Sequence, residues 1–236
     1  MKKYLSVFIM FGIIFVGAIS VFAQKKSSTP LMDHRAYVGA FIGDNTGGTQ
    51  TNNTATVSGA GSASLSNLTE TNGLAGGAEL GYYSHHFGAE LDDVAMGWTI
   101  PTQYVTATVG NTSGPLNIGK LTGTRNVFLL NGLGRIPIST SWGMWYPYLG
   151  IGPGFVAGTA QKSGSTETWT MNPSWAFDFK IGAAFVWQNG FGLFIEDQGI
   201  GTGINLSGTS PTQSGTLKGT SVNGVLDVGV SYNFKL

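Results

Sequence analysis

Cysteine, charge and long apolar runs are scarce in this sequence. Its 236 residues include no cysteine, which excludes a disulfide framework and a thiolate metal site. Only 10% of the residues are charged, whereas a soluble domain carries about 25%. The formal net charge is zero. Nucleic acid is therefore not expected as a partner, because phosphate binding needs a basic patch.

Glycine, aromatic and small polar residues are abundant instead. The chain has 37 glycines, and 12% of its residues are aromatic. Threonine, serine and asparagine are also frequent. This composition is typical of many short strands joined by turns rather than of helices.

The first 23 residues form a separate unit. Lys2 and Lys3 precede an apolar run from Tyr4 to about Phe22, and Ala23 follows with the small side chain that a signal peptidase recognises. This pattern predicts a cleavable secretory signal peptide with the cut between Ala23 and Gln24. The alternative is an N-terminal transmembrane anchor, since the run is about long enough to span a bilayer. We predict three segments: a signal peptide over 1–23, a periplasmic lead-in over 24–35, and the folded domain over 36–236.

The remainder of the chain has no stretch of 18 uninterrupted apolar residues. We therefore expect no transmembrane helix after Ala23. Only helices and closed barrels satisfy every backbone hydrogen bond in lipid. A membrane location would therefore require a β-barrel.

Segments of alternating residues predict eight strands, with connections that alternate between short and long. Short connections are expected near 84–86, 139–143 and 188–190, and long ones at 44–72, 99–120, 159–173 and 203–219. Such sorting is typical of an all-β, eight-stranded antiparallel transmembrane barrel with up-and-down meander topology, whose short turns face the periplasm. The expected strands cover 36–43, 73–84, 87–98, 121–136, 144–158, 174–187, 190–202 and 220–235.

The side chains of each strand divide into two faces, since successive residues point in opposite directions. In 174–187 one face carries Trp175, Phe177 and Phe179, and the other carries Asp178 and Lys180. The charged face is rich in glycine and alanine, which suits a narrow interior. A charge at mid-membrane on the lipid face costs about 2–4 kcal/mol, so the aromatic face is expected to be the outside.

This assignment predicts two groups of residues. An interior polar network should contain Glu79, Glu90, Asp92, Arg125, Asp178, Lys180, Glu196 and Asp227. Aromatic anchors at the two membrane interfaces should be Trp142, Trp145, Trp175 and Trp187. Asp93 and Asp197 break the pattern by falling on the outward face, and either a bulge or proximity to the rim would explain them.

Several motifs together resemble the OmpA/OmpX-like superfamily of eight-stranded outer-membrane barrels. They are Tyr37-Val38-Gly39, Leu80-Gly81-Tyr82-Tyr83, the run from Pro147 to Gly154, Gly192 to Glu196, and the ending Gly229 to Phe234. The likeness covers nearly all of the chain after the signal peptide, and only the barrel domain of the family. It implies export to a Gram-negative outer membrane, contact with its lipid and lipopolysaccharide, and assembly by the barrel assembly machinery. Family members usually end on an aromatic residue, whereas this chain ends Phe234-Lys235-Leu236.

No catalytic, cofactor or metal residues are predicted. Barrel hydrolases need a base near a Ser or Asp at the outer rim. The three histidines, His34, His85 and His86, fall in the lead-in and in a short turn instead. An enzyme is therefore not expected, although a hydrolase whose topology brings a histidine to the rim is the alternative. The adjacent His85 and His86 point apart in a turn, which favours solvated side chains over a metal site.

Two functions remain open at this point. The neutral long loops favour a structural or surface-interaction role, in adhesion or envelope integrity, with an extracellular ligand that the sequence does not identify. The alternative is a narrow porin-like or OmpW-like channel for small solutes or hydrophobic molecules. An eight-stranded barrel is only wide enough for side chains, so the interior charges are expected to form a plug of paired groups. A conducting path would prefer cations, because the predicted network has six acids and two bases.

Overall fold

The computed structural model describes residues 34–164, 167–209 and 214–235, and these are almost entirely β-strand. The predicted signal peptide lies outside the described residues. Among the described residues no helix is long and apolar enough to cross a membrane. Within these ranges the structure has thirteen strands: β1 (Arg35–Val57), β2 (Gly61–Leu65), β3 (Leu68–Glu70), β4 (Gly73–Ser84), β5 (Phe87–Ile100), β6 (Gln103–Val109), β7 (Thr112–Ile118), β8 (Leu121–Arg135), β9 (Ile138–Ser139), β10 (Gly143–Lys162), β11 (Thr168–Trp187), β12 (Phe191–Thr209) and β13 (Ser214–Lys235).

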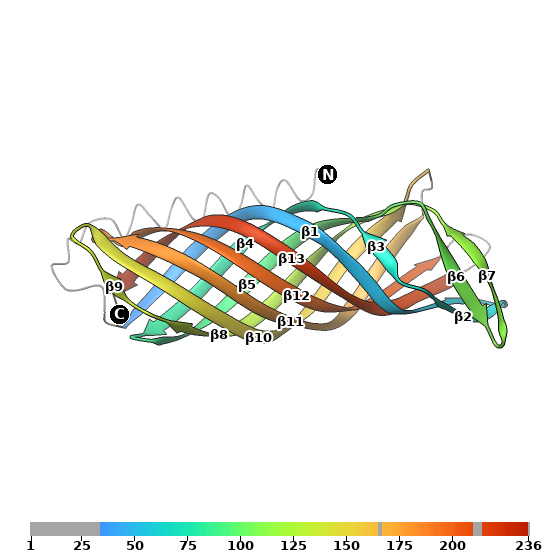
Figure 1. Ribbon diagram of the computed structural model, residues 1–236, viewed down its shortest axis with the longest axis horizontal. Coiled ribbons are helices and arrows are strands. Elements are labelled where there is room, and N and C mark those ends of the chain that lie inside the picture. Colours follow the sequence, from blue (N-terminus) through green and yellow to red (C-terminus); the bar gives the residue numbers. More distant parts are fainter. Residues whose placement is uncertain (1–33, 165–166, 210–213, 236) are drawn as a thin grey trace.

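Eight of these strands form a closed antiparallel ring, which we call the barrel (Figure 1). The ring order is β1, β4, β5, β8, β10, β11, β12 and β13, which is also their order in the chain. The last strand pairs with the first from Arg35↔Lys235 to Val57↔Gly215, so the ring has no open edge. The all-β antiparallel prediction is confirmed, and the order is that of a meander.

The strands of the barrel are strongly staggered. Following paired residues once around the ring from Asn45 leads back to Arg35, ten residues away on the same strand. Eight strands with this stagger are tilted by about 40° from the barrel axis. A barrel of this size encloses only enough room for side chains.

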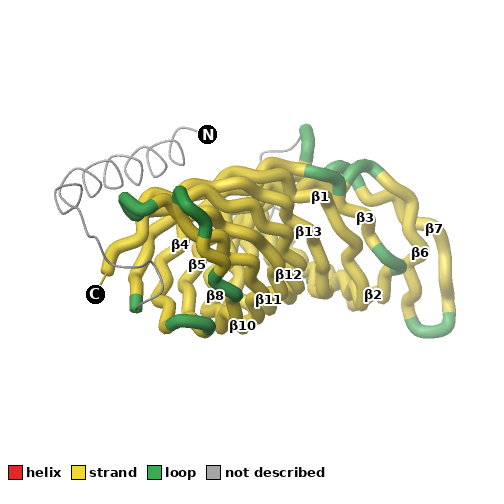
Figure 2. The backbone as a smooth tube through the Cα atoms, turned by 60° about the vertical axis from the view of Figure 1, so that its left-hand side comes forward, coloured by secondary structure: helices red, strands yellow, loops and turns green. Residues whose placement is uncertain are grey.

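The short connections lie at one end, which we call the turn end. Ser84 and Phe87 flank the two-residue turn at His85 and His86, in which His85 takes a left-handed backbone with φ 55°. In the turn before Phe191 the φ of Gly190 is 90°, which suits a glycine. The other end, which we call the loop end, carries β2, β6 and β7 (Figures 1 and 2).

Most of the residues expected in long loops are in strands. The first strand continues to Val57 rather than ending near residue 43, and β10 to β13 extend through most of 159–173 and 203–219. The region 99–120 contains the β6–β7 hairpin. The prediction of loops was wrong here because runs of threonine, serine and glycine lack the apolar face that marks a strand in the sequence. Pairing with a neighbouring strand is enough to make such runs part of a strand. The barrel therefore continues well beyond its apolar zone.

Candidate functional site

The outer wall of the barrel carries an apolar belt next to the turn end. Aromatic and aliphatic side chains such as Leu149, Phe177, Phe179 and Val228 are about half exposed there. On β10 the outward apolar residues run from Trp145 to Phe155, which corresponds to about 25 Å along the axis. This height matches the apolar band of membrane barrels, which is about 25 Å.

The four predicted interface tryptophans lie near the two edges of this belt. Trp175 is exposed next to Phe155 on the edge toward the loop end, and Trp142 is exposed in the turn before β10. Trp145 and Trp187 lie at the turn end, where both rings contact Phe185 at centroid distances of 5.0 and 4.9 Å. Phe191 extends this aromatic row, 5.6 Å from Trp187.

Beyond the belt the two faces of the wall exchange character. In the belt part of β5, Leu91 points outward and Asp92 inward, whereas farther along the same strand Met96, Trp98 and Ile100 are buried inside. β12 follows the same pattern, with Ile200, Ile204 and Leu206 buried inside the loop end. Outward residues at this level are small or polar, including Thr99, Thr122, Thr124 and Thr170. At the loop end the apolar side chains point inward, as in a soluble barrel, whereas near the turn end they point outward and the charged side chains point inward.

All eight residues of the predicted interior network lie inside the barrel with at most 7% exposure. They form two separate groups rather than one. Lys180 is the centre of the first, the lumen network, and Arg125 belongs to the second. The lumen network contains Lys180 with Glu79, Glu90, Asp92, Asp178, Glu196 and Asp227.

Lys180 bonds three carboxylates, two from β5 and one from β12. Its Nζ lies 2.7 Å from Glu90 Oε1, 2.6 Å from Asp92 Oδ2 and 3.1 Å from Glu196 Oε1. The side chain of Lys180 is fully buried. Gly150 on the neighbouring strand makes room for it, since a Cβ there would come 2.5 Å from Lys180 Cγ.

Neutral donors hold the surrounding carboxylates in place. Asn131 donates to Asp92 Oδ2 at 2.9 Å and to Asp178 Oδ2 at 3.0 Å. Tyr148 donates to Glu196 at 2.8 Å, and Tyr37 donates to Glu90. Gln198 donates to both Glu196 and Asp227. Such a cross-linked set of buried groups fills the lumen at this level.

The second group, the outer polar cluster, lies toward the loop end and contains a residue that sequence reasoning missed. Arg125 bonds Glu70 with 2.6 Å between Nη2 and Oε1, and both side chains are fully buried. Asn223 and Ser221 also donate to Glu70, at 3.0 and 3.3 Å. Glu70 was expected in a surface loop, yet β3 carries it into the barrel. The available signal was that Arg125 faced inward with no assigned acid at its level.

The net effect of its surroundings is to lower the pKa of the Glu70 carboxyl. Burial alone would raise this pKa above the ordinary value of 4.5. The charge of Arg125 and the hydrogen bonds from Asn223 and Gln50 outweigh burial, because they stabilise the carboxylate. Glu70 belongs to β3, outside the eight ring strands and beyond the apolar belt.

Toward the turn end, an arginine is held between two tyrosines. The guanidinium carbon of Arg135 lies 3.8 Å from the ring centre of Tyr83 and 4.3 Å from that of Tyr146. Its Nε donates to the carbonyl of His85 at 3.1 Å. His85 and His86 form the short turn, and His34 contacts Tyr82 outside the barrel. The described histidines therefore all lie at the turn end.

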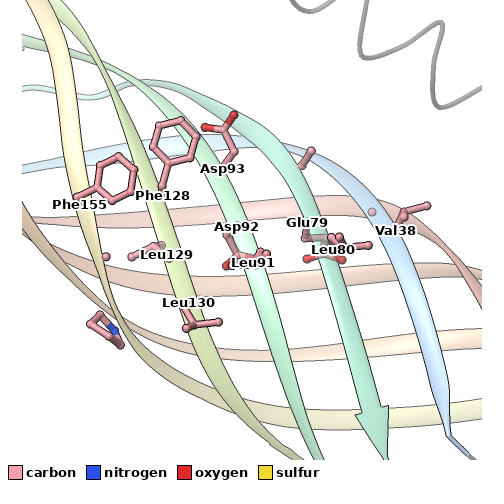
Figure 3. Close-up of a pocket in the computed structure, with 14 residues that line it drawn as sticks. Val38, Glu79, Leu80, Leu91, Asp92, Asp93, Phe128, Leu129, Leu130 and Phe155 are labelled. Atoms are coloured by element: carbon pink, nitrogen blue, oxygen red, sulfur yellow. The ribbon is translucent and has the colours of Figure 1, made fainter.

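A groove of about 610 Å³ crosses the outer wall over β1, β4, β5, β8 and β10 (Figure 3). Its lining is apolar and includes Leu80, Leu91, Leu130 and Phe155. Asp93 lies at one end of the groove, next to Phe128.

Two outward carboxylates lie within the belt. Asp93 pairs in register with Ala78 and Phe128, and Asp197 pairs with the exposed Ile181 and Leu226. The register shows no shift at either residue, and apolar residues surround both. The bulge explanation is therefore wrong, whereas proximity to the rim stays a prediction. Nothing in the structure explains these two positions.

Comparison with known proteins adds to these observations at the level of the fold. No protein-family model and no curated protein matches the sequence. The outer membrane protein OprG of Pseudomonas aeruginosa matches 86% of this chain and 97% of its own, with 14% identity and a TM-score of 0.51. The outer membrane protein AlkL matches 90% of this chain and 94% of its own, with 17% identity and a TM-score of 0.46. Neisserial surface protein A matches 84% and 97%, with 15% identity and a TM-score of 0.44.

The fold and the likeness to OprG define the class of structure. The chain has the fold of the eight-stranded outer-membrane β-barrels, so the resemblance expected from the motifs is confirmed at that level. Sequence identity of 14% carries no more than the fold.

Proposed function

We propose that this chain is an integral outer-membrane barrel with a closed lumen, and that its role is to present the loop end at the cell surface. That role is structural or adhesive, through contacts of the loop end with an external ligand. The observation that carries the proposal is the exchange of apolar and polar faces along single strands.

The belt near the turn end suits a lipid surrounding, and the loop end suits water. In lipid the outside of a barrel must be apolar, whereas in water the apolar side chains turn inward. The turn end meets the first condition over a height of about 25 Å, and the loop end meets the second. This pattern supports a barrel that crosses the membrane with its turn end and projects its loop end into water.

The filled interior supports surface presentation over a porin-like channel. The lumen network fills the barrel at the level of the belt. The apolar cluster that includes Met96, Trp98 and Ile200 fills it farther toward the loop end. A water-filled path would need both sets of side chains to move. We expect purified protein in planar bilayers to show no steady conductance, and a stable cation-selective conductance would favour the channel instead.

The apolar groove supports a second candidate function, contact with hydrophobic molecules at the outer wall. The groove is large enough for part of an acyl chain. Binding there needs no path through the lumen. Replacing Leu130 with a tryptophan would fill the groove and should abolish such binding while leaving the surface role intact.

Single cysteines test the orientation directly, because the chain has none of its own. A membrane-impermeant maleimide applied to intact cells should label Tyr104→Cys in the exposed β6–β7 hairpin. It should label Gln188→Cys in a short turn only after the outer membrane is opened. Phe179→Cys, in the middle of the belt, should stay unlabelled in both cases. Labelling of Gln188→Cys on intact cells, or of Phe179→Cys, would contradict the proposal.

The surface role is tested by a loop-end variant. Replacing 103–118 with a short glycine–serine turn removes the β6–β7 hairpin while leaving the ring pairing of Ile100 with Leu121. Cells expressing this variant should lose adhesion to host matrix or to neighbouring cells, and their envelope should remain intact. If cells with the variant adhere as well as cells with the wild-type protein, the role is purely structural. The detergent sensitivity of cells that lack the protein would then test that structural role.

A further inference from the structure

The lumen network contains far more negative than positive charge. Six carboxylates surround one ammonium group, that of Lys180, so five negative charges remain when all are ionised. Arg125 is engaged with Glu70 in the outer polar cluster, and Arg135 is stacked between Tyr83 and Tyr146. Buried charges are costly unless they are compensated. The lumen network therefore needs further positive charge, from bound protons or from a cation.

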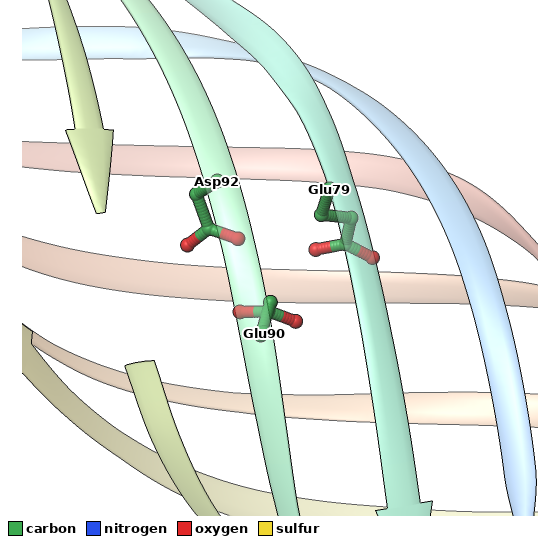
Figure 4. A group of neighbouring side chains, drawn as sticks. All are labelled: Glu79, Glu90 and Asp92. Carbon is green, nitrogen blue, oxygen red and sulfur yellow. The ribbon is translucent and has the colours of Figure 1, made fainter. Parts of the chain in front are cut away.

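Three of the carboxylates converge at one place. Glu79, Glu90 and Asp92 each offer an oxygen within 4.8 Å of the others (Figure 4). Glu79 on β4 pairs in register with Asp92 on β5, and Glu90 lies two residues along the same inward face. We call these three residues the carboxylate trio.

The trio has unused ligand atoms that are buried. Among the described residues, no side chain donates a hydrogen bond to Glu79, which is only 7% exposed. Asp92 Oδ1 is also buried without a hydrogen-bond partner, while Oδ2 accepts from Lys180 and Asn131. Gly39 lies against the Glu79 carboxylate and leaves the space that this group occupies.

A small cavity adjoins two of the three carboxylates. Its volume is about 20 Å³, and Glu79 and Glu90 line it at one end, with tyrosines and Arg135 farther toward the turn end. A volume above about 10–15 Å³ holds one water molecule, so the cavity can hold one small ion or its bound water. It lies on the side of the trio toward the turn end.

We propose that the carboxylate trio binds a divalent cation that prefers oxygen ligands, of the calcium or magnesium type. The two Glu79 oxygens and Asp92 Oδ1 accept no side-chain hydrogen bond from the described residues, whereas both Glu90 oxygens and Asp92 Oδ2 already accept one. Hard cations bind carboxylates of this kind with waters completing the shell. The lumen network offers no thiolate and no imidazole, so a zinc-type site is excluded there. The cation neutralises two of the five excess charges and cross-links β4 to β5 inside the barrel.

Terbium luminescence tests this proposal with the full chain purified in detergent and stripped with EDTA. Tyr37 donates to Glu90, so a terbium ion at the trio lies close to a tyrosine that sensitises its emission. We expect saturable emission excited through tyrosine, and we expect excess calcium to suppress it. Absence of emission from the folded wild-type protein, or emission that calcium does not displace, would overturn the proposal.

Isosteric variants locate the site. Glu79→Gln and Asp92→Asn should each weaken binding by at least about tenfold. Asp227→Asn is the matched control, because Asp227 is a buried carboxylate of the same network outside the trio, and it should retain binding. Equal loss in all three variants, or loss in none, would also overturn the proposal. Heat-modifiable mobility on gels verifies that each variant is folded before the titration.

Calcium also has a predicted effect that needs no variant. A cation that binds only the folded barrel raises its unfolding midpoint in proportion to the logarithm of its concentration. The wild-type protein should therefore unfold at higher denaturant in calcium than in EDTA, and Glu79→Gln should lose this difference. An identical midpoint of the wild-type protein in both conditions would contradict cation binding.

Discussion

Single residues in the lumen carry much of the barrel's electrostatic stability. Lys180 compensates three carboxylates at once, so its removal leaves each of them without its cation. Arg125 has the same relation to Glu70, with one acid instead of three. Lys180 thereby joins β11 to β5 and β12, and Arg125 joins β8 to β3.

Lys180→Met should lower the free energy of unfolding by about 3–5 kcal/mol, because removing one partner leaves buried charges uncompensated. Urea unfolding of the refolded barrel in lipid vesicles, followed by tryptophan fluorescence, measures this loss. Lys218→Met is the control, since Lys218 is exposed on β13, and it should change stability by less than about 0.5 kcal/mol. Equal effects of the two substitutions would contradict the role given to Lys180.

Glu70 gives the barrel a pH dependence of known sign. Its pKa is lowered in the folded protein, so its stabilisation is fully present above the ordinary value of 4.5 and is lost as the pH falls through the folded value. Wild type should therefore exceed Glu70→Gln in stability at neutral pH, and the difference should shrink below about pH 4.5. Unfolding curves from pH 7 to pH 3 measure the two proteins. A difference that stays constant or grows in acid would refute this assignment.

Among the elements, the strand pairs of the belt depend on small inward residues. Gly150 on β10 faces Lys180 and Leu133, and a Cβ there would come 2.5 and 2.6 Å from their side-chain carbons. Gly134 on β8 faces outward and has open space around it. The same residue type therefore has two different functions on neighbouring strands.

Gly150→Ala should destabilise the barrel by about 1–3 kcal/mol through overpacking. Gly134→Ala is the matched control and should be close to neutral, because nothing lies within 4 Å of its Cβ position. Urea unfolding in lipid vesicles measures the free energy of unfolding of both variants. If Gly134→Ala proved the more harmful, the facing of β8 and β10 would be reversed.

The elements also show where sequence patterns stop being informative. The alternation of Phe177, Asp178, Phe179 and Lys180 predicts the facing of β11, because a large contrast separates its two faces. The stretch from Asp44 to Val57 shows no such contrast, and its strand character comes from pairing with β13 on one side and with β2 and β3 on the other. Strand ends in polar runs therefore depend on neighbours rather than on residue types.

At the scale of the whole molecule, the barrel has two zones with opposite relations to solvent. The belt near the turn end is apolar outside and charged inside, and the loop end is the reverse. Asp197 is an exception within the belt, since Ile181 and Leu226 flank it on the exposed wall. Its effect on stability therefore depends on what surrounds the barrel.

Asp197→Leu should stabilise the barrel in lipid by about 1–3 kcal/mol, because a lipid-facing acid is unfavourable near mid-membrane. Unfolding in phosphatidylcholine vesicles measures this gain. Thr124→Leu is a matched control on the exposed wall of the loop end, where no such gain is expected. A loss of stability in Asp197→Leu would mean that this wall does not face lipid.

The sequence by itself determined the closed antiparallel architecture, the number of ring strands and the facing of the belt residues. It could do so because side chains alternate with a period of two, and lipid and a narrow lumen demand opposite residue types. Only the tertiary structure decided that Lys180 joins Glu90, Asp92 and Glu196, that Glu70 reaches Arg125, and that the loop end has an apolar interior. These contacts arise because a ring staggered by ten residues brings distant strands to one level, and no local pattern records that stagger.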